Sequence, residues 1–184
     1  MRVVAGSAGG RNLFTPEGDD VRPTKDRVRE AIFNSLHSYG EVEGRRFLDL
    51  FAGSGALGIE ALSRGASTCT FVDNDRRAIE VVRENIEHLG LAQDAVIRHG
   101  DAMSLLPSLG AFDVAVLDPP YSFEDWPTLL EAVPAATVVI ESDRAIDPGG
   151  HWRILKEKRY AGTVVVIARR AEGAGPTEEE DRRP

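Results

Sequence analysis

The residues with the clearest chemical potential are the four of Asp118-Pro119-Pro120-Tyr121, which follow the apolar run 114–117. That run has the length and composition of a buried strand in a parallel sheet. Because proline cannot donate to a strand ladder, the chain must leave the sheet directly after Asp118. The carboxylate and the aromatic ring are therefore expected at the carboxyl end of a strand, where open α/β sheets bind ligands. Taken alone, the four residues fit an ordinary turn equally well.

A glycine-rich segment upstream favours a ligand site. Gly53, Gly55 and Gly58 form a G-x-G-x-x-G pattern between an expected strand, 47–51, and an expected helix, 59–64. Glycines let the backbone turn tightly and approach a ligand, and the start of the helix offers free N–H groups. The pattern is weak by itself, since glycine-rich turns between strands and helices also occur with no ligand.

Acids at the ends of neighbouring expected strands strengthen this interpretation. The strand expected at 68–72 ends in Asp73, 24 residues after Asp49, at the position where a ribose diol is usually bound. The strand expected at 95–98 leads to Asp101, which is either a loop acid or an acceptor for an adenine amino group. With the glycine loop and Asp118, these acids fall at strand carboxyl ends and should converge on one crevice.

Strands and helices alternate from residue 47 onward, which predicts an α/β protein with a doubly wound, mostly parallel sheet. A helix capped by Asp75 and closed by Gly90 is expected between the second and third strands. The remaining elements are expected at 103–109 and 129–133 for helices, and at 137–140, 152–156 and 163–168 for strands.

The N-terminal region is expected to form a hairpin and a helix. Segments 2–5 and 11–14 should pair around Gly9-Gly10, since glycine supplies the positive φ of a tight turn. A helix should follow Pro23, with Thr24 as its N-cap. Basic side chains crowd the start of this helix, where cations oppose the helix dipole. This crowding suggests an external anion, with solvated surface charge as the alternative.

The composition is that of a soluble globular chain of 184 residues with a net charge of −8. The acidity lies in residues 47–149, net −11, whereas residues 1–46 and 150–170 carry +1 and +5, which permits a local phosphate-binding face. Cys69 is the only cysteine, which excludes an internal disulfide and a cysteine-based metal cluster. No run approaches the ~20 apolar residues of a membrane helix and no signal segment begins the chain, so we expect a cytoplasmic protein.

The stretch from Asp49 to Gly55 followed by Asp118-Pro119-Pro120-Tyr121 resembles the class I S-adenosylmethionine-dependent methyltransferases, in the branch that methylates amino groups. The segment Arg22 to Asn34, with Arg2 to Gly6 and Gly10-Arg11, is similar to the bacterial small-subunit rRNA guanine-N2 methyltransferases of the RsmD type. This resemblance covers residues 1 to about 170. It implies a seven-stranded sheet with a reversed last strand, S-adenosylmethionine as cofactor, and a guanine of 16S rRNA on 30S particles as substrate.

The expected organisation is an N-terminal hairpin and helix at 1–43, which should contact RNA, and a methyltransferase core at 44–170. An acidic tail follows at 171–184, expected to be disordered because it lacks an apolar pattern.

The resemblance also implies roles for single residues. The target amino group would be held by Asp118 and Pro119, and Pro120 and Tyr121 complete the catalytic set, with the ring against the base. Asp73 would bind the ribose hydroxyls, and Asp101 with Ala102 would hold the adenine. The remaining cofactor contacts are expected at Asp49, Phe51, Ala52, Gly53, Ser54, Gly55, Asn74 and Asp118. RNA contacts are expected at Arg2, Arg11, Arg22, Thr24, Lys25, Arg27 and Arg29, with Lys156, Lys158 and Arg159 as weaker candidates.

Other functions stay open at this point. A DNA adenine-N6 methyltransferase would use the same motif, because Asp118 alone does not reject adenine, although no separate target-recognition domain is evident. An NAD-dependent oxidoreductase would also fit the glycine pattern and Asp73. A non-catalytic cofactor-binding subunit is disfavoured by the intact motif at 118–121. We expect a monomer with no metal and no membrane partner.

Overall fold

The computed structural model describes residues 1–15 and 23–171, with side chains in the second range from residue 25 onward. Arg22, the side chain of Thr24 and the predicted tail from Glu172 lie outside the described residues. The backbone of Thr24 lies inside the first turn of helix α1 (Pro23–Ser38), so its predicted place at the N-cap is wrong. Proline is well suited to the first helical position, which explains why the helix begins at Pro23, two residues before the start predicted with Thr24 as N-cap.

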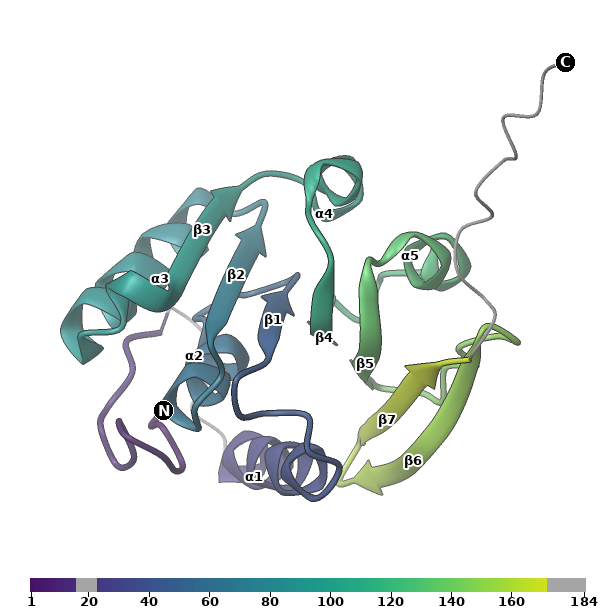
Figure 1. Ribbon diagram of the computed structural model, residues 1–184, viewed down its shortest axis with the longest axis horizontal. Coiled ribbons are helices and arrows are strands. Elements are labelled where there is room, and N and C mark those ends of the chain that lie inside the picture. Colours follow the sequence, from purple (N-terminus) through teal and green to yellow (C-terminus); the bar gives the residue numbers. More distant parts are fainter. Residues whose placement is uncertain (16–22, 172–184) are drawn as a thin grey trace, which may run out of the picture.

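In the described part of the chain, one seven-stranded sheet has the order β3-β2-β1-β4-β5-β7-β6 (Figure 1). Strands β1 to β5 are parallel, and β7 runs antiparallel to both β5 and β6, which confirms the predicted α/β sheet with its reversed last strand. The strands are β1 (Arg46–Asp49), β2 (Thr68–Asp73), β3 (Ala95–His99), β4 (Phe112–Leu117), β5 (Ala135–Ser142), β6 (Trp152–Tyr160) and β7 (Thr163–Arg170). The helices are α1, α2 (Ala56–Ser63), α3 (Arg76–Leu89), α4 (Ala102–Leu105) and α5 (Trp126–Ala132), with 3₁₀ turns η1 (Ala92–Asp94) and η2 (Leu106–Ser108).

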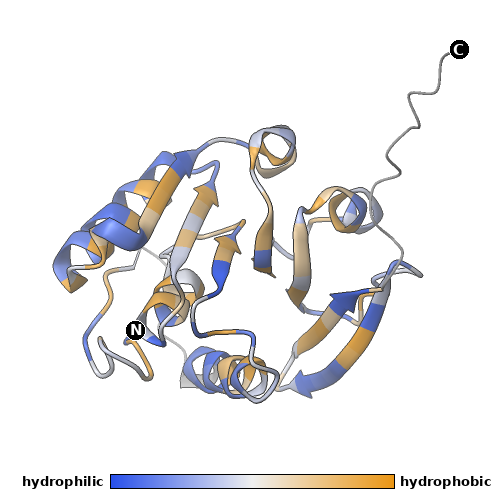
Figure 2. Ribbon diagram, viewed as in Figure 1, coloured by the Kyte–Doolittle hydropathy of each residue, from blue (hydrophilic) through white to orange (hydrophobic). Residues whose placement is uncertain are grey.

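Helices cover both faces of the sheet and bury two apolar clusters. Side chains of α1, α2 and α3 pack in one cluster, and those of α4 and α5 pack in the other. Successive residues of a strand point to opposite faces, so Val114 and Val116 join the first cluster while Ala115 and Leu117 join the second. Figure 2 shows apolar residues along the central strands and hydrophilic residues on the outer sides of α1 and α3.

The N-terminal segment folds back as a hairpin whose regular pairing is limited to one bridge, Arg2 to Asn12, instead of the two short strands expected. It is held against α2 by Glu60, whose carboxylate accepts from the backbone nitrogens of Val4 at 2.7 Å and Ala5 at 3.0 Å. A Cβ on Gly6 would lie 1.8 Å from a backbone oxygen of α2, so only glycine permits this approach. The hairpin is therefore supported by the protein itself.

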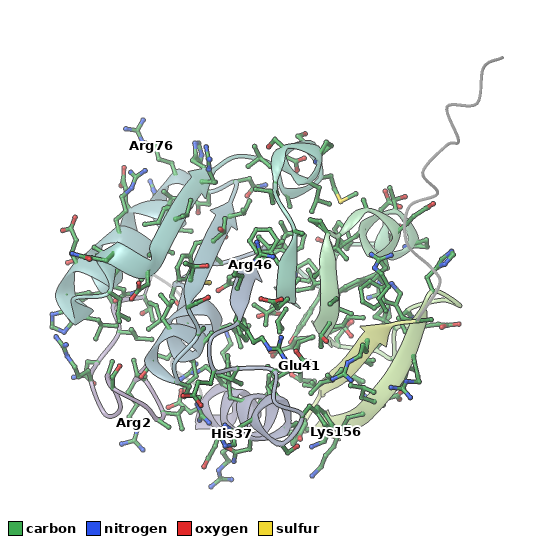
Figure 3. The ribbon with its side chains drawn as sticks, in the orientation of Figure 1. Arg2, His37, Glu41, Arg46, Arg76 and Lys156 are labelled. Atoms are coloured by element: carbon green, nitrogen blue, oxygen red, sulfur yellow. The ribbon has the colours of Figure 1, made fainter. Side chains whose placement is uncertain are left out.

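The antiparallel edge of the sheet is tied to α1 and the loop after it. Lys156 on β6 donates to the Oγ of Ser35 at 2.6 Å, and Arg169 on β7 donates to Glu41 at 2.6 Å (Figure 3). Lys156 thus has a structural partner, while the ammonium of Lys158 lies over the ring of Tyr160. None of the described helices has the length and apolar character needed to cross a membrane.

Candidate active site

A pocket of about 790 Å³ lies along the carboxyl ends of β1, β2, β4 and β5. This is the crevice that the positions of the acids predicted. Ten of the predicted catalytic and cofactor residues line it, namely Phe51, Gly53, Asp73, Asn74, Asp101, Ala102, Asp118, Pro119, Pro120 and Tyr121. A second pocket of about 170 Å³ shares Phe51, Gly53 and Asp118 with the first and brings in the predicted residues Ala52 and Ser54.

Asp49 and Gly55 are predicted cofactor contacts that line neither pocket. Asp49 is only 1% exposed and accepts from the backbone nitrogen of Gly58 at 2.9 Å, so it holds the glycine loop from below. Burial raises the pKa of Asp49 to about 7, with a smaller contribution from the charges of Asp118 and Asp73. Gly55 precedes α2 with a φ of 79°, so its role is the left-handed turn into the helix.

Asp73 joins the end of β2 to the glycine loop. Its Oδ2 accepts from the backbone nitrogen of Gly53 at 2.8 Å, and its Oδ1 accepts from that of Asp75 at 2.8 Å. An ionised carboxylate offers about four lone-pair sites, so two remain for further donors. The side chain is therefore fixed in orientation and still able to bind a diol.

Asp101 lies at the N-terminus of α4, on the rim of the pocket. Its Oδ1 accepts from the backbone nitrogen and the hydroxyl of Ser104, both at 2.8 Å. These hydrogen bonds lower the pKa of Asp101, which keeps the group ionised at neutral pH. Asp101 thus caps α4 and also lines the pocket.

The acid Glu141 also lines the pocket, and the sequence analysis gave it no role. Leu117 of β4 and Ile140 of β5 are register partners in a parallel pair, so the acids that follow them, Asp118 and Glu141, lie side by side. Desolvation by burial raises the pKa of Glu141 to about 8, and the charge of Asp118 adds to this, while Lys25 and Arg29 oppose it. Glu141 directly follows the apolar run 138–140, and this position could have identified it from the sequence.

The loop after Asp118 is anchored from the segment that follows β5. Arg144 donates to the carbonyl oxygens of Tyr121 at 3.3 Å and Phe123 at 3.1 Å. Phe123 packs edge-to-face on Phe51 and on Trp126. The ring of Tyr121 is 59% exposed and lines the open side of the pocket, where it can receive a planar ligand.

The predicted RNA contacts separate into buried and exposed groups. Arg29 is 4% exposed, forms an ion pair with Asp26 at 2.9 Å and donates to the carbonyl of Arg2, so its predicted contact with RNA is wrong. The side chain lies on the face of α1 that is turned toward Glu60 and the hairpin. Its place in a cluster of basic residues at the start of a helix did not reveal this orientation. Arg11 is exposed but donates to the carbonyls of His88 and Leu89 at the end of α3.

Three other predicted RNA contacts, Arg2, Lys25 and Arg27, have exposed side chains. Arg2 points away from the sheet (Figure 3), Arg27 is exposed on α1, and Lys25 is exposed and lines both pockets. In the described residues, no group of three or more His, Cys, Asp or Glu side chains is placed to hold a metal ion.

Residues 1–169 match the family described as "Conserved hypothetical protein 95". The chain belongs to this family. It is 41% identical to "Putative rRNA methyltransferase YlbH" of Bacillus subtilis (strain 168), over 91% of this chain and 97% of that protein. It is 34% identical to "Ribosomal RNA small subunit methyltransferase D" of Escherichia coli (strain K12), over 97% and 93% of the two chains. The solved structure of "Putative methyltransferase yhhF from Escherichia coli" has a TM-score of 0.80 and 31% identity, covering 92% of this chain and 97% of that one. These similarities confirm the resemblance noted in the sequence.

Proposed function

We propose that this protein transfers a methyl group from S-adenosylmethionine to the exocyclic N2 amino group of a guanine in 16S rRNA, on the 30S subunit or an assembly intermediate. The observation that carries the proposal is that Asp118 and Tyr121 open onto the same pocket as the glycine loop and the acids of β2 and β3. The names of the related proteins support rRNA as the substrate class.

The residues of the pocket fit S-adenosylmethionine. Asp73 keeps two acceptor sites for the ribose hydroxyls after binding two backbone donors. Asp101, with the backbone of Ala102, is placed to take the adenine amino group. The methionine portion would lie on Gly53 and Ser54, beside the smaller pocket. When bound, this cofactor supplies a methyl group that its sulfonium has already activated, so no metal or protein nucleophile is needed.

The protein's task is to prepare the amino nitrogen. The lone pair of guanine N2 is delocalised into the ring and is poorly aimed at a methyl group. Acceptors at Asp118 and the carbonyl of Pro119 would hold its two N–H bonds and favour a more tetrahedral nitrogen. The nitrogen becomes cationic as it attacks, and a preorganised carboxylate stabilises that charge. The proton is acidic after transfer, so a strong general base is unnecessary.

The target base must leave its stack to reach Asp118, and the exposed ring of Tyr121 offers a face on which it can lie. Arg2 on the hairpin and Arg27 on α1 are exposed and are our candidates for phosphate contacts. Neutralising such contacts lowers the salt dependence of RNA binding. A salt dependence unchanged by substituting Arg2 and Arg27 would assign them to ordinary surface charge.

The test is methyl transfer from labelled S-adenosylmethionine to 30S subunits from a strain that lacks such an enzyme, beside naked rRNA and duplex DNA. The products are digested to nucleosides and separated. We expect N2-methylguanosine from the subunits. N6-methyladenine from DNA would establish the alternative adenine activity, and binding of NAD in place of S-adenosylhomocysteine would establish an oxidoreductase. Cofactor binding without transfer to any substrate would contradict the proposal.

A further inference from the structure

We propose that Glu141 and Lys25 select guanine as the target base by pairing with its Watson–Crick edge, while Asp118 holds the N2 amino group. This inference rests on the proposed function and names the residues that give it base specificity. It concerns a part of the pocket that cofactor binding leaves unassigned.

The sheet order places Glu141 on the substrate side of Asp118. The candidate cofactor residues belong to β1, β2 and β3, which lie to one side of β4, whereas Glu141 ends β5 on the other side. The register of Leu117 with Ile140 sets the two acids level on neighbouring strands, roughly 5 Å apart between backbones. A base with its amino group at Asp118 would therefore present its next edge atom toward Glu141.

Lys25 adds a third polar group to this part of the pocket. It comes from the first turns of α1 and lines the same two pockets as Asp118 and Glu141. Its charge lowers the pKa of Glu141, although burial and Asp118 raise that pKa by more. Together the three side chains offer a carboxylate directly after β4, a carboxylate near the end of β5 and an ammonium from α1.

The edge of guanine has the complementary pattern. It presents two donors in succession, the N2 amino group and N1–H, followed by the acceptor O6. Carboxylates accept only and an ammonium donates only, so Asp118, Glu141 and Lys25 match these atoms in order. Adenine presents the acceptor N1 where guanine has a donor, which would leave Glu141 facing a lone pair. A site built for hydrogen bonds rejects a base that leaves its buried groups unpaired.

The electrostatics of the site agree with a donor arriving at Glu141. Two adjacent carboxylates repel, and in the free protein burial and Asp118 favour a protonated Glu141. A guanine N1–H brings a donor to the same oxygen and allows the proton to leave. The base and the proton would therefore compete for Glu141.

The test uses a base that keeps the reacting amino group and changes the rest of the edge. The methylated guanine is first mapped with wild-type protein, and 16S rRNA carrying 2,6-diaminopurine at that position is prepared by ligation and reconstituted into 30S particles. This analogue keeps N2 but presents an acceptor at N1 and a donor at position 6. We expect wild-type protein to prefer guanine by about a hundredfold or more in kcat/KM.

Glu141→Gln supplies both an acceptor and a donor, so we expect it to lose activity on guanine and to narrow the preference below about tenfold. Its affinity for S-adenosylhomocysteine, measured by calorimetry, should stay within about twofold of wild type, which also shows that it folds. Glu131→Gln, an exposed acid on α5, is the matched control and should behave as wild type.

Lys25→Met is a second, independent variant. It removes the donor to O6, so it should also reduce the preference for guanine over 2,6-diaminopurine in kcat/KM. An unchanged preference for guanine in both site variants, or a loss of cofactor affinity equal to the loss of turnover, would overturn the inference. Failure of the proposed function is a separate result, because wild-type protein would then form no N2-methylguanosine.

Discussion

The backbone nitrogen of Gly53 donates to the carboxylate of Asp73 at 2.8 Å, so the glycine loop after β1 and the acid at the end of β2 form one unit. The loop is thereby held at its pocket side by Asp73 and at its buried side by Asp49, through Gly58. Asp73 thus has two roles, because it faces the ligand and also fixes the position of the glycine loop. Loss of Asp73 should therefore remove a hydrogen-bond acceptor for the ligand and also release the glycine loop.

We expect Asp73→Ala to weaken binding of S-adenosylhomocysteine by tenfold or more. A hydrogen bond to a charged group contributes about 1.5–3 kcal/mol. Loss of the Asp73 carboxylate removes its hydrogen bonds to the ligand, and about 1.4 kcal/mol already corresponds to a tenfold change in affinity. Isothermal titration calorimetry measures the effect. Asp75→Ala is the control, because Asp75 caps α3 and lines neither pocket. Wild-type affinity in Asp73→Ala would remove this residue from the cofactor site.

The third glycine of the pattern serves packing, and Gly58→Ala should destabilise the fold. A Cβ at this position would lie 2.3 Å from the ring of Phe71 and 2.6 Å from the Sγ of Cys69. Overpacking of a core typically costs about 1–3 kcal/mol, which exceeds the gain of up to ~1 kcal/mol from replacing a helical glycine. Urea unfolding should show a lower midpoint. Gly110→Ala, which meets no atom within 4 Å, should leave it unchanged.

Glu60 is a buried anion that joins three elements, and its removal should be costly. It pairs with Arg64 at 2.6 Å and Arg29 at 3.6 Å, besides accepting from the hairpin backbone. Breaking a buried pair leaves an uncompensated charge and costs about 3–5 kcal/mol, so Glu60→Ala should lower the free energy of unfolding by this amount. Glu80→Ala breaks an exposed i,i+4 pair with Arg76 and should change it by less than about 1 kcal/mol. Equal effects in both variants would contradict the structural role of Glu60.

Much of the site could be predicted because its signals are local in the sequence. An apolar run that ends in an acid marks the carboxyl end of a strand, which placed Asp73, Asp101 and Asp118 on one crevice. The glycine pattern placed the loop in the same way. These assignments need only the order of elements and the parallel direction of the strands.

The remaining features depend on contacts between distant segments. Arg29 lies among basic residues at a helix start, and only the position of Glu60, 31 residues later, makes it a core residue. The pairing of Asp118 with Glu141 depends on the register between β4 and β5, which the two apolar runs do not determine. The resemblance implied a cofactor contact for Asp49, and only the fold shows that its carboxylate accepts from the backbone nitrogen of Gly58.

Asp118→Ala should nearly abolish methyl transfer while the affinity for S-adenosylhomocysteine changes little. The carboxylate is assigned to the target amino group, and removal of a preorganised electrostatic partner typically costs about 10²–10³ in kcat. Labelled methyl transfer to 30S subunits measures turnover, and calorimetry measures affinity on the same preparation. Unchanged turnover in Asp118→Ala would contradict the assignment of Asp118 to the target amino group.

The pH dependence of methyl transfer should depend on Glu141. Its pKa is raised to about 8, chiefly by burial, with Asp118 adding to the shift and Lys25 and Arg29 opposing it. A raised pKa in a carboxyl group means that the neutral form dominates below pH 8 and the carboxylate above it. If the carboxylate is the form that accepts guanine N1–H, about a tenth of the free enzyme is competent at pH 7, and kcat/KM should rise about tenfold by pH 9.

The comparison of wild type with Glu141→Gln isolates this group from Asp49, whose pKa of about 7 is present in both proteins. The variant should lack the rise between pH 7 and pH 9, since its amide does not titrate. A wild-type profile that falls above pH 8 would mean that the protonated acid is the form that meets the base. In that case Glu141 would donate to O6 itself, and the substitution of Lys25 should leave the preference for guanine intact.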